Sequence, residues 1–395
     1  MSRIRRVHRK RFPRVRKFFA RFRRGTEVTS TEGNRVILYR QGGDFFPALF
    51  EAIENSKQTV CLEFYIVRDD HTGRQLAALL AAAVQRGVRA YLLYDYIGSF
   101  ETAGSFFRGM EKAGVHCVAF NPPPFRRGIA WFDTRDHRKI AVIDGRLAFT
   151  GGVNIGEEYA GFGDCPSRWR DLGIRLEGPA VDELQRLFRE NWHAETGRVP
   201  DGCWSSLAPA AAGESEVMIV SGIPHGARSL IRETFRMAIA GATDSVTLET
   251  PYFIPGPRVM RSLLRATRRG VQVRLILPAL SDVPLVRLVS RSFYASLLRG
   301  GIEIFEREGT ILHAKVLLVD DDWAMLGSAN LDQRSFHRNF EVNVIVTSRE
   351  FGDQLADMLA EDLGRSRPVV LAEHERRGVT VRLLERLCAT INWFL

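Results

Sequence analysis

Two segments of this 395-residue chain present the same reactive side chains at the same spacing. Each segment, HRKIAVID or HAKVLLVD, contains a histidine, a lysine two residues on and an aspartate seven residues on: His137, Lys139 and Asp144 in the first, and His313, Lys315 and Asp320 in the second. Because alternate residues of a strand point to the same side, we expect each imidazole to face one site together with its ammonium group. Histidines that exchange protons near neutral pH, beside lysines that attract phosphate oxygens, are suited to phosphodiester chemistry.

A turn of small residues that carries an asparagine follows each segment, 17 residues after its histidine. The turns read GGVN, ending at Asn154, and GSAN, which contains Ser328 and Asn330. We expect these three polar side chains to bind phosphate oxygens. A single copy of the pattern could be explained by core histidines bonded to backbone carbonyls. Two copies at equivalent places favour one site built from both halves, in which one histidine attacks phosphorus and the other protonates the leaving group.

The elements that must position these residues also occur twice. The predicted strands are residues 59–70, 88–95 and 115–120 in the first half, and 245–255, 271–278 and 302–306 in the second. Helical segments that end at glycine separate them, including residues 76–86 and 263–269. This alternation predicts the α/β class, with mixed sheets flanked by helices. A segment rich in Pro, Gly, Ser and Ala, residues 197–216, is typical of a linker between the two units.

The positive charge of the chain is concentrated at its N-terminus. The whole chain has 56 Lys and Arg against 46 Asp and Glu, but residues 1–25 hold 12 of the basic residues and no acidic one. The remainder is therefore slightly acidic, which argues against a body that wraps nucleic acid. Val15, Phe18, Phe19 and Phe22 share one face of a helix, so we expect this tail to bind an anionic membrane surface. A solvated basic tail and an RNA-binding arm remain alternatives.

The C-terminal segment, residues 379–395, is also amphipathic. Leu384, Leu387, Cys388, Ile391 and Leu395 fall on one helical face, and arginines lie nearby. This pattern predicts either a second interfacial segment or an ordinary helix docked on the body. No stretch reaches the roughly 20 apolar residues that span a bilayer. The five cysteines form no CxxC pair, so we expect reduced thiols without a metal or nucleophile role.

The duplicated pattern resembles the HKD signature of the phospholipase D superfamily, over residues 36–367. The resemblance implies two pseudo-symmetric domains with the active site at their interface. It also implies a two-step reaction without metal or other cofactor, through a phosphohistidine intermediate. By analogy His137 is the nucleophile, and His313 is the general acid and then the base. Because the two motifs are symmetric, the reverse assignment remains open.

The superfamily also places a carboxylate behind each catalytic histidine, and the best matches are Asp171 and Glu341. Such an acid fixes the tautomer of the imidazole and stabilises the imidazolium. Exposed strand carboxylates are the alternative interpretation of these two residues. We expect Asp144 and Asp320 to hold strand ends and not to touch substrate.

Four segments, residues 62–73, 136–159, 249–255 and 327–343, together resemble bacterial cardiolipin synthases of the shorter type, which lacks two N-terminal transmembrane helices. The resemblance implies transfer of a phosphatidyl group to phosphatidylglycerol, with release of an alcohol such as glycerol. Glu63 and Glu249 occupy matching repeat positions, and we interpret them as pocket residues that orient a hydroxyl, or else as paired structural carboxylates. Tyr252 could line the lipid entrance.

The sequence therefore predicts a tail (1–25), a first phospholipase D-like domain (26–200), a linker (201–216), a second domain (217–368) and an amphipathic end (369–395). We expect a peripheral enzyme on the cytoplasmic side of the bacterial cell membrane, with no nucleic-acid partner. A phospholipase D-type hydrolase or a nuclease of the same superfamily is the alternative enzyme. A membrane-bound scaffold with an inactive site is the non-enzymatic alternative.

Overall fold

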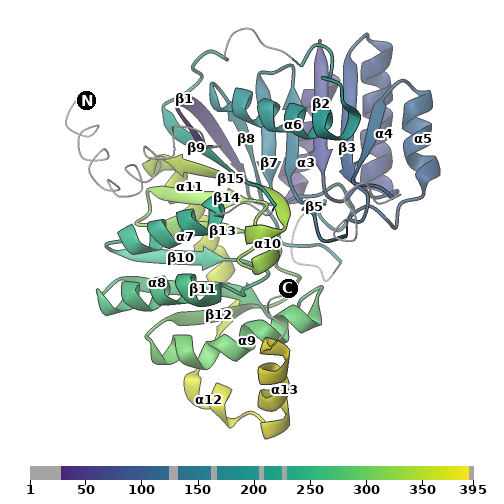
Figure 1. Ribbon diagram of the computed structural model, residues 1–395. Helices are drawn as coiled ribbons and strands as arrows, with labels where there is room; N and C mark the ends of the chain where they lie inside the picture. Colours follow the sequence, from purple (N-terminus) through teal and green to yellow (C-terminus); the bar gives the residue numbers. More distant parts are fainter. Residues whose placement is uncertain (1–27, 124–131, 162–166, 204–208, 225–228, 391–395) are drawn as a thin grey trace.

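The computed structural model describes residues 28–123, 132–161, 167–203, 209–224 and 229–390 (Figure 1). The predicted basic tail (residues 1–25), Cys165 and the last five residues of the predicted C-terminal segment lie outside these ranges. Within the described ranges, no helix is both long and apolar enough to cross a membrane.

One mixed sheet runs through both halves, and its strand order repeats on either side of a central seam. The seam is the antiparallel pair of β1 (Val28–Tyr39) and β9 (Ser215–Gly222). Outward from β1 the order is β8, β7, β6, β2, β3 and β4, and outward from β9 it is β15, β14, β13, β10, β11 and β12, with β16 at the edge. The three outer strands of each repeat are parallel to one another, and the inner ones pair antiparallel. This architecture confirms the predicted α/β fold with a duplicated unit.

The strands follow the predicted order along the chain. In the first half they are β2 (Thr59–Phe64), β3 (Arg89–Asp95), β4 (His116–Phe120), β5 (Arg135–Asp136), β6 (Lys139–Ile143), β7 (Leu147–Gly151) and β8 (Gly173–Glu177). In the second half they are β10 (Ser245–Glu249), β11 (Gln272–Pro278), β12 (Glu303–Arg307), β13 (Val316–Val319), β14 (Trp323–Gly327), β15 (Asn339–Thr347) and β16 (Ser366–Pro368). The short β5 lies off the main path and pairs with β15 of the other half.

Helices cover both faces of the sheet (Figure 1). On one face, α6 (Ala180–Thr196) and α11 (Arg349–Gly364) share a core that includes Leu184, Phe188 and Leu355 together with strands of both halves. The remaining helices are α3 (Gly42–Glu54), α4 (His71–Gln85), α5 (Gly104–Lys112), α7 (Leu230–Gly241), α8 (Gly256–Arg268), α9 (Pro284–Arg299), α10 (Gln333–His337), α12 (Leu371–Arg376) and α13 (Val379–Ala389). On the opposite face, α3, α4 and α5 cover the first half and α7, α8 and α9 cover the second.

Two predicted strands end earlier than the apolar pattern indicates. The strand predicted over residues 59–70 ends at Phe64, and the one over 245–255 ends at Glu249. Beyond these ends the chain leaves the sheet, and each segment forms one isolated bridge, Val67 with Ile155 and Phe253 with Leu331. Val67 and Phe253 are buried in these bridges. Their apolar character therefore reflects contact with the asparagine-bearing turns and not continued strand pairing.

The segment between the halves makes one contact that no sequence spacing indicates. Helix α6 ends at Thr196, Gly197 follows in a left-handed conformation, and β9 begins at Ser215. Within this segment, Cys203 is buried with its Sγ 2.7 Å from Sγ of Cys61 on β2. Burial raises the pKa of the Cys61 thiol well above its ordinary value, so it stays protonated.

The two aspartates of the HxKx4D segments lie at the far end of their strands from the histidines. Asp144 accepts hydrogen bonds from the backbone amides of Lys57, Gln58 and Thr59, at 2.7–2.9 Å. Asp320 accepts in the same way from three amides of residues 243–245. Both residues adopt positive φ, 52° and 50°, which Asp tolerates better than most residues. Each aspartate thus ties the start of one strand to the end of its antiparallel neighbour.

We predict that Asp320→Ala lowers the free energy of unfolding by about 1–3 kcal/mol, because it removes the buried, charged acceptor of three partly buried backbone amides. Asp320→Asn is the matched control. It keeps one acceptor oxygen and the tolerance of positive φ, so it should cost less than half as much. Urea denaturation followed by circular dichroism measures both values. Equal losses in the two variants would contradict this explanation.

Candidate active site

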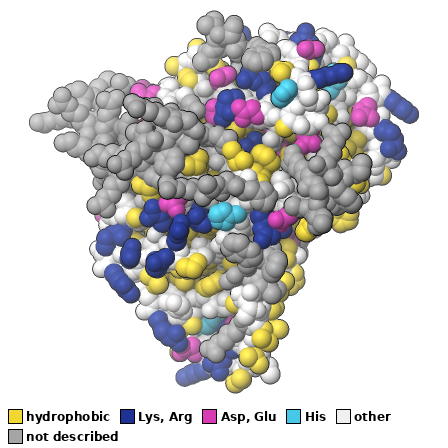
Figure 2. All heavy atoms as spheres, in the orientation of Figure 1, with side chains coloured by type: hydrophobic (Ala, Val, Ile, Leu, Met, Phe, Trp, Pro, Cys, Tyr) yellow, Lys and Arg dark blue, Asp and Glu magenta, His cyan; other side chains and the backbone are white. Residues whose placement is uncertain are grey.

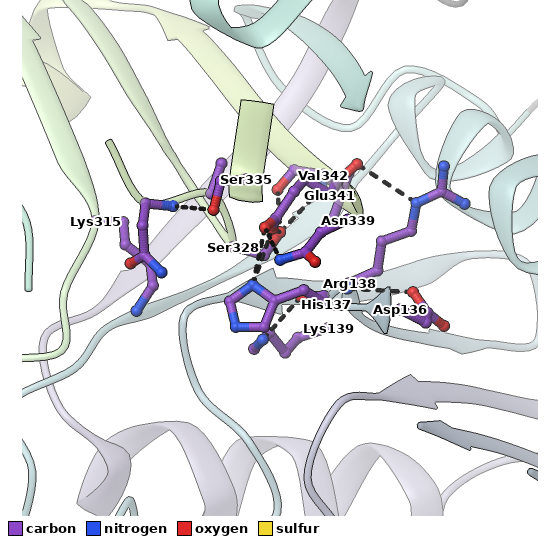
Figure 3. Close-up of polar contacts among 12 residues, drawn as sticks. Asp136, His137, Arg138, Lys139, Lys315, Ser328, Ser335, Asn339, Glu341 and Val342 are labelled. Carbon is purple, nitrogen blue, oxygen red and sulfur yellow. Dashed lines mark hydrogen bonds and ion pairs between the residues drawn. The ribbon is translucent and has the colours of Figure 1, made fainter. Parts of the chain in front are cut away.

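Each histidine of the repeated pattern is held by a carboxylate of the other half. His137 follows β5, and its Nδ1 lies 3.0 and 3.1 Å from the two carboxylate oxygens of Glu341 on β15 (Figure 3). His313 precedes β13, and its Nδ1 lies 2.6 Å from Oδ2 of Asp171, which precedes β8. The structure therefore brings the four predicted residues together as two crossed dyads, because the seam places β15 and β8 between the two histidine-bearing strands.

Backbone hydrogen bonds join the two halves beside each dyad. The amide of His137 donates to the carbonyl of Phe340 at 2.9 Å, and the amide of His313 donates to the carbonyl of Arg170 at 2.8 Å. In each case the acceptor residue directly precedes the carboxylate that holds the same histidine. Each histidine is thus held by one backbone hydrogen bond and one side-chain hydrogen bond, and both partners belong to the other half of the molecule.

The surroundings of the two carboxylates differ: Glu341 accepts side-chain hydrogen bonds, and Asp171 packs closely against a glycine. The Ser328 hydroxyl and the Asn339 amide both donate to Glu341 (Figure 3). The counterpart of Ser328 is Gly152, and a Cβ atom at that position would lie 2.1 Å from Oδ1 of Asp171. Glycine is therefore required there, because it leaves room for the shorter acid. Ser328, predicted to bind phosphate, contacts the acid behind His137 instead of facing an open site.

Both imidazoles are buried, and this controls their charge. Burial lowers the pKa of His137 to about 4, although the charge of Glu341 opposes the shift. Burial and the charge of Lys315 also lower the pKa of His313, against the charge of Asp171. Burial alone would raise the pKa of Glu341, but His137 and its hydrogen bond bring it below the ordinary value. At pH 7 the site therefore contains a neutral His137 hydrogen-bonded to an ionised Glu341.

Both lysines lie beside the histidines, and neither forms a salt bridge with a carboxylate among the described residues. Nζ of Lys139 donates to the carbonyl of His137 at 2.8 Å and lies 5.2 Å from the centre of the Tyr65 ring. Nζ of Lys315 lies 2.9 and 3.3 Å from the ring nitrogens of His313. Burial lowers the pKa of Lys139 to about 7 and that of Lys315 to about 8. A bound anion would favour the charged form of both groups.

The two asparagines of the turns differ in their surroundings. The Asn154 side chain accepts from the amide of Ile66 at 3.2 Å and donates to the hydroxyl of Tyr159 at 2.9 Å. The side-chain oxygen of Asn330 is buried and has no hydrogen-bond partner among the described residues. Asn154 therefore supports Tyr159, whose ring lies edge-on to His313 at 5.4 Å, while Asn330 is the freer of the two amides.

Glu63 and Glu249 do not line an open pocket, because both are fully buried. Glu63 accepts from the Asn191 amide at 2.9 Å, and burial raises its pKa. Neither carboxylate oxygen of Glu249 has a hydrogen-bond partner in the described chain, and burial together with the charge of Asp362 raises its pKa well above the ordinary range. Of the two interpretations left open, the structure supports buried carboxylates beneath the site. Tyr252 is partly exposed, and its hydroxyl donates to Asp282 at 2.5 Å.

Several residues that contact the dyads were not identified from the sequence. Asn339 could have been found, because it precedes Glu341 by two residues in the same strand and therefore shares its face. Tyr159 and Trp169 pack against the His313 ring, and Tyr65 packs against His137. These aromatic residues carry no repeated pattern, so no spacing marks them.

Comparison with known proteins agrees with this geometry. The family model described as "Cardiolipin synthase, PLD-like domain" matches residues 49–192 and 235–363. A cardiolipin synthase of Geobacillus thermodenitrificans is 34% identical over 376 residues, covering 94% of this chain and 74% of that protein. Cardiolipin synthase A of Pseudomonas entomophila is 37% identical over 351 residues, covering 87% and 71%.

Among solved structures, a phosphatidylserine synthase of Haemophilus influenzae Rd KW20 superposes with a TM-score of 0.67 over 91% of this chain and 95% of that one. At 13% identity this likeness concerns the fold alone. The sequence relatives and the family model go further. The chain belongs to the cardiolipin synthase family of the phospholipase D superfamily, and it is an enzyme of the phosphatidyltransferase class.

We predict that Glu341→Gln lowers the pKa of His137 below its native value of about 4, because the amide removes the negative charge that favours the imidazolium. NMR titration of ¹⁵N-histidine-labelled protein measures this pKa. Since the unfolded pKa is near 6.5, native stability should fall as pH drops from about 6.5 towards 4. Asp171→Asn is the control and should leave the His137 titration unchanged. An unchanged or raised pKa in Glu341→Gln would contradict the assigned pairing.

Proposed function

We propose that the chain is a cardiolipin synthase that transfers a phosphatidyl group to phosphatidylglycerol through a covalent phosphatidyl-histidine intermediate. The observation that carries this proposal is the pair of crossed dyads, which brings two imidazoles and two buried ammonium groups to one site between the halves. Two histidines on one phosphodiester can divide the work, one as nucleophile and one as proton donor and acceptor.

In the first step, Nε2 of His137 attacks the phosphorus of the donor lipid. The new P–N bond forms as the P–O bond to the leaving alcohol breaks, and His313 gives its proton to the departing oxygen. The alcohol is glycerol when the donor is phosphatidylglycerol. Lys139 and Lys315 stabilise the negative charge on the phosphoryl oxygens in the transition state. Any help from Asn330 comes from its side-chain NH2 group, because the side-chain oxygen is an acceptor.

In the second step, His313 takes the proton from a glycerol hydroxyl of phosphatidylglycerol. That oxygen attacks phosphorus, the P–N bond breaks, and cardiolipin leaves with His137 restored. His137 is favoured as nucleophile because no described residue hydrogen-bonds to its Nε2, whereas Nζ of Lys315 lies 3.3 Å from Nε2 of His313. Asp171 and Glu341 keep the Nδ1 hydrogens in place through both steps.

The membrane that contains the substrate is the proposed partner. Residues 1–25 carry 12 Lys and Arg and no acidic residue, which favours attachment to an anionic leaflet on the cytoplasmic side. Nucleic acid is not the proposed substrate, because the chain beyond residue 25 is slightly acidic. If water replaced the second lipid, the same site would act as a phospholipase D-type hydrolase and release phosphatidic acid.

We predict that His137→Ala and His313→Ala each lower phosphatidyl transfer by about 10³-fold or more, as expected for the loss of a nucleophile or a general acid. The assay incubates labelled phosphatidylglycerol vesicles with each protein and separates the lipid products. His71→Ala, which changes an exposed histidine, is the control and should retain activity. Release of phosphatidic acid alone would refute the synthase assignment. Cleavage of oligonucleotides instead would favour a nuclease, and activity retained in both variants would refute the mechanism.

We also predict that His313→Ala accumulates the covalent adduct on His137 when the donor carries a good leaving group such as nitrophenol. Such a donor needs no general acid in the first step, but the second step still lacks its base. Mass spectrometry of peptides from the trapped protein locates the phosphatidyl group. An adduct on His313 in the His137→Ala variant would instead support the reverse assignment.

A further inference from the structure

Helix α13 presents its apolar side to solvent and its polar side to the protein. Val379, Leu383 and Leu387, which follow one another at four-residue intervals, are 71%, 56% and 58% exposed. Leu384 on the adjoining side is 48% exposed. Glu385, on the opposite side of the helix, is buried. A surface helix normally buries its leucines and exposes its glutamate, so this orientation is the reverse of the usual one.

A network of ion pairs between buried glutamates and partly buried arginines holds α13 in this orientation. Glu385 accepts hydrogen bonds from both terminal nitrogens of Arg377, which lies just before the helix. Arg291 of α9 lies 3.9 Å from the same carboxylate and 3.6 Å from Glu306 at the end of the sheet. Turning the helix to bury its leucines would break this network and leave charged groups buried without partners, which is costly. The exposed leucines are therefore a stable feature of this arrangement.

Helices α8 and α9 supply positive charge without negative charge, whereas α12, just before α13, carries both signs. Neither α8 nor α9 contains an acidic residue. The exposed arginines of α8 are Arg258, Arg261, Arg265 and Arg268. Figure 2 shows Lys and Arg side chains gathered over α8 and hydrophobic side chains over α13 in one view of the molecule. An apolar ridge beside a basic surface matches the two layers of an anionic bilayer, its acyl chains and its headgroups.

The inner side of α13 contacts the region beside His313. Cys388 packs into a small cluster with Ile254, Val283 and Tyr252. The Tyr252 hydroxyl donates to Asp282, whose charge opposes in part the lowering of the pKa values of His313 and Lys315. Tyr252 and Ile254 in turn exchange backbone hydrogen bonds with Leu331, which follows Asn330 in the second turn of the site. Helix α13 therefore packs on the segment that borders this turn.

We propose that the ridge formed by Val379, Leu383, Leu384 and Leu387 is a lipid-docking surface that inserts into an anionic membrane beside the active site. The inference rests on the proposed function, because it takes the substrate to be a membrane lipid. It deepens that function by assigning membrane insertion to a structured helix whose orientation is fixed by Glu385. A second copy of this chain is the alternative occupant of the ridge, and it would show as a dimer in solution.

The test measures flotation of the full-length protein with vesicles of phosphatidylglycerol and phosphatidylcholine at about 0.5 M NaCl, where contributions from exposed basic residues are largely screened. Leu383→Ser combined with Leu387→Ser should weaken vesicle partitioning at least tenfold. The matched control, Phe100→Ser combined with Val199→Ser, changes two exposed apolar residues away from α13 and should alter partitioning less than twofold. Flotation of the α13 variant at the wild-type level would overturn the proposal.

A second pair of measurements separates this proposal from the proposed function. With monomeric short-chain phosphatidylglycerol, the α13 variant should transfer phosphatidyl groups as fast as the wild type, whereas with vesicles its rate should fall with its binding. If the wild type transfers no phosphatidyl group in either assay, the proposed function fails, while a tenfold difference in flotation still supports the docking surface. A wild-type dimer that becomes monomeric in the α13 variant, with flotation unchanged, would assign the ridge to a second copy and overturn the proposal.

Discussion

The exchange of carboxylates across the seam is the constraint on which the rest of the structure depends. Glu341 lies on β15 and reaches His137, and Asp171 lies before β8 and reaches His313. Both contacts require the register of four central strands, β15, β9, β1 and β8. A shift of one residue in the pairing of β15 would turn Glu341 to the opposite face of the sheet, and a shift of β8 would move Asp171, which precedes that strand, away from His313. The geometry of the site therefore depends directly on the register of the central strands.

The basic groups of the site are buried, and their protonation depends on whether an anion is bound beside them. Two ammonium groups and two imidazoles lie inside the protein, and burial lowers the pKa of all four. Their protonated forms are costly without an anion nearby. A phosphodiester that enters replaces lost hydration with its own negative charge, which shifts the groups towards protonation. The low-polarity surroundings disfavour the charged forms of these side chains when no anion is bound, and they strengthen the electrostatic contacts of the same side chains with a charged transition state.

Much of the fold could be predicted from the sequence because its signals are local and repeated. The strands and helices of each half, and the two HxKx4D segments, follow from apolar periodicity and residue spacing. Asp171 and Glu341 could be named from the family resemblance, but which acid holds which histidine could not be predicted, since the two repeats are nearly symmetric and only the β1–β9 seam determines that the acids cross. Glu63 and Glu249 were open to two interpretations because their burial arises from α6 and α11, which come later in the chain. The Cys61–Cys203 contact joins residues far apart in the same way.

The β1–β9 seam also determines how much the segment between α6 and β9 contributes to holding the two halves together. Covalent continuity there is not what keeps the two halves together, because paired backbone strands, a shared core and the crossed dyads already do so. We therefore expect a polypeptide cut once in this segment to keep the groups of the candidate site in place. Two separated fragments, by contrast, would each retain a histidine without its acid. The contacts that hold the two halves together are thus the same contacts that build the site.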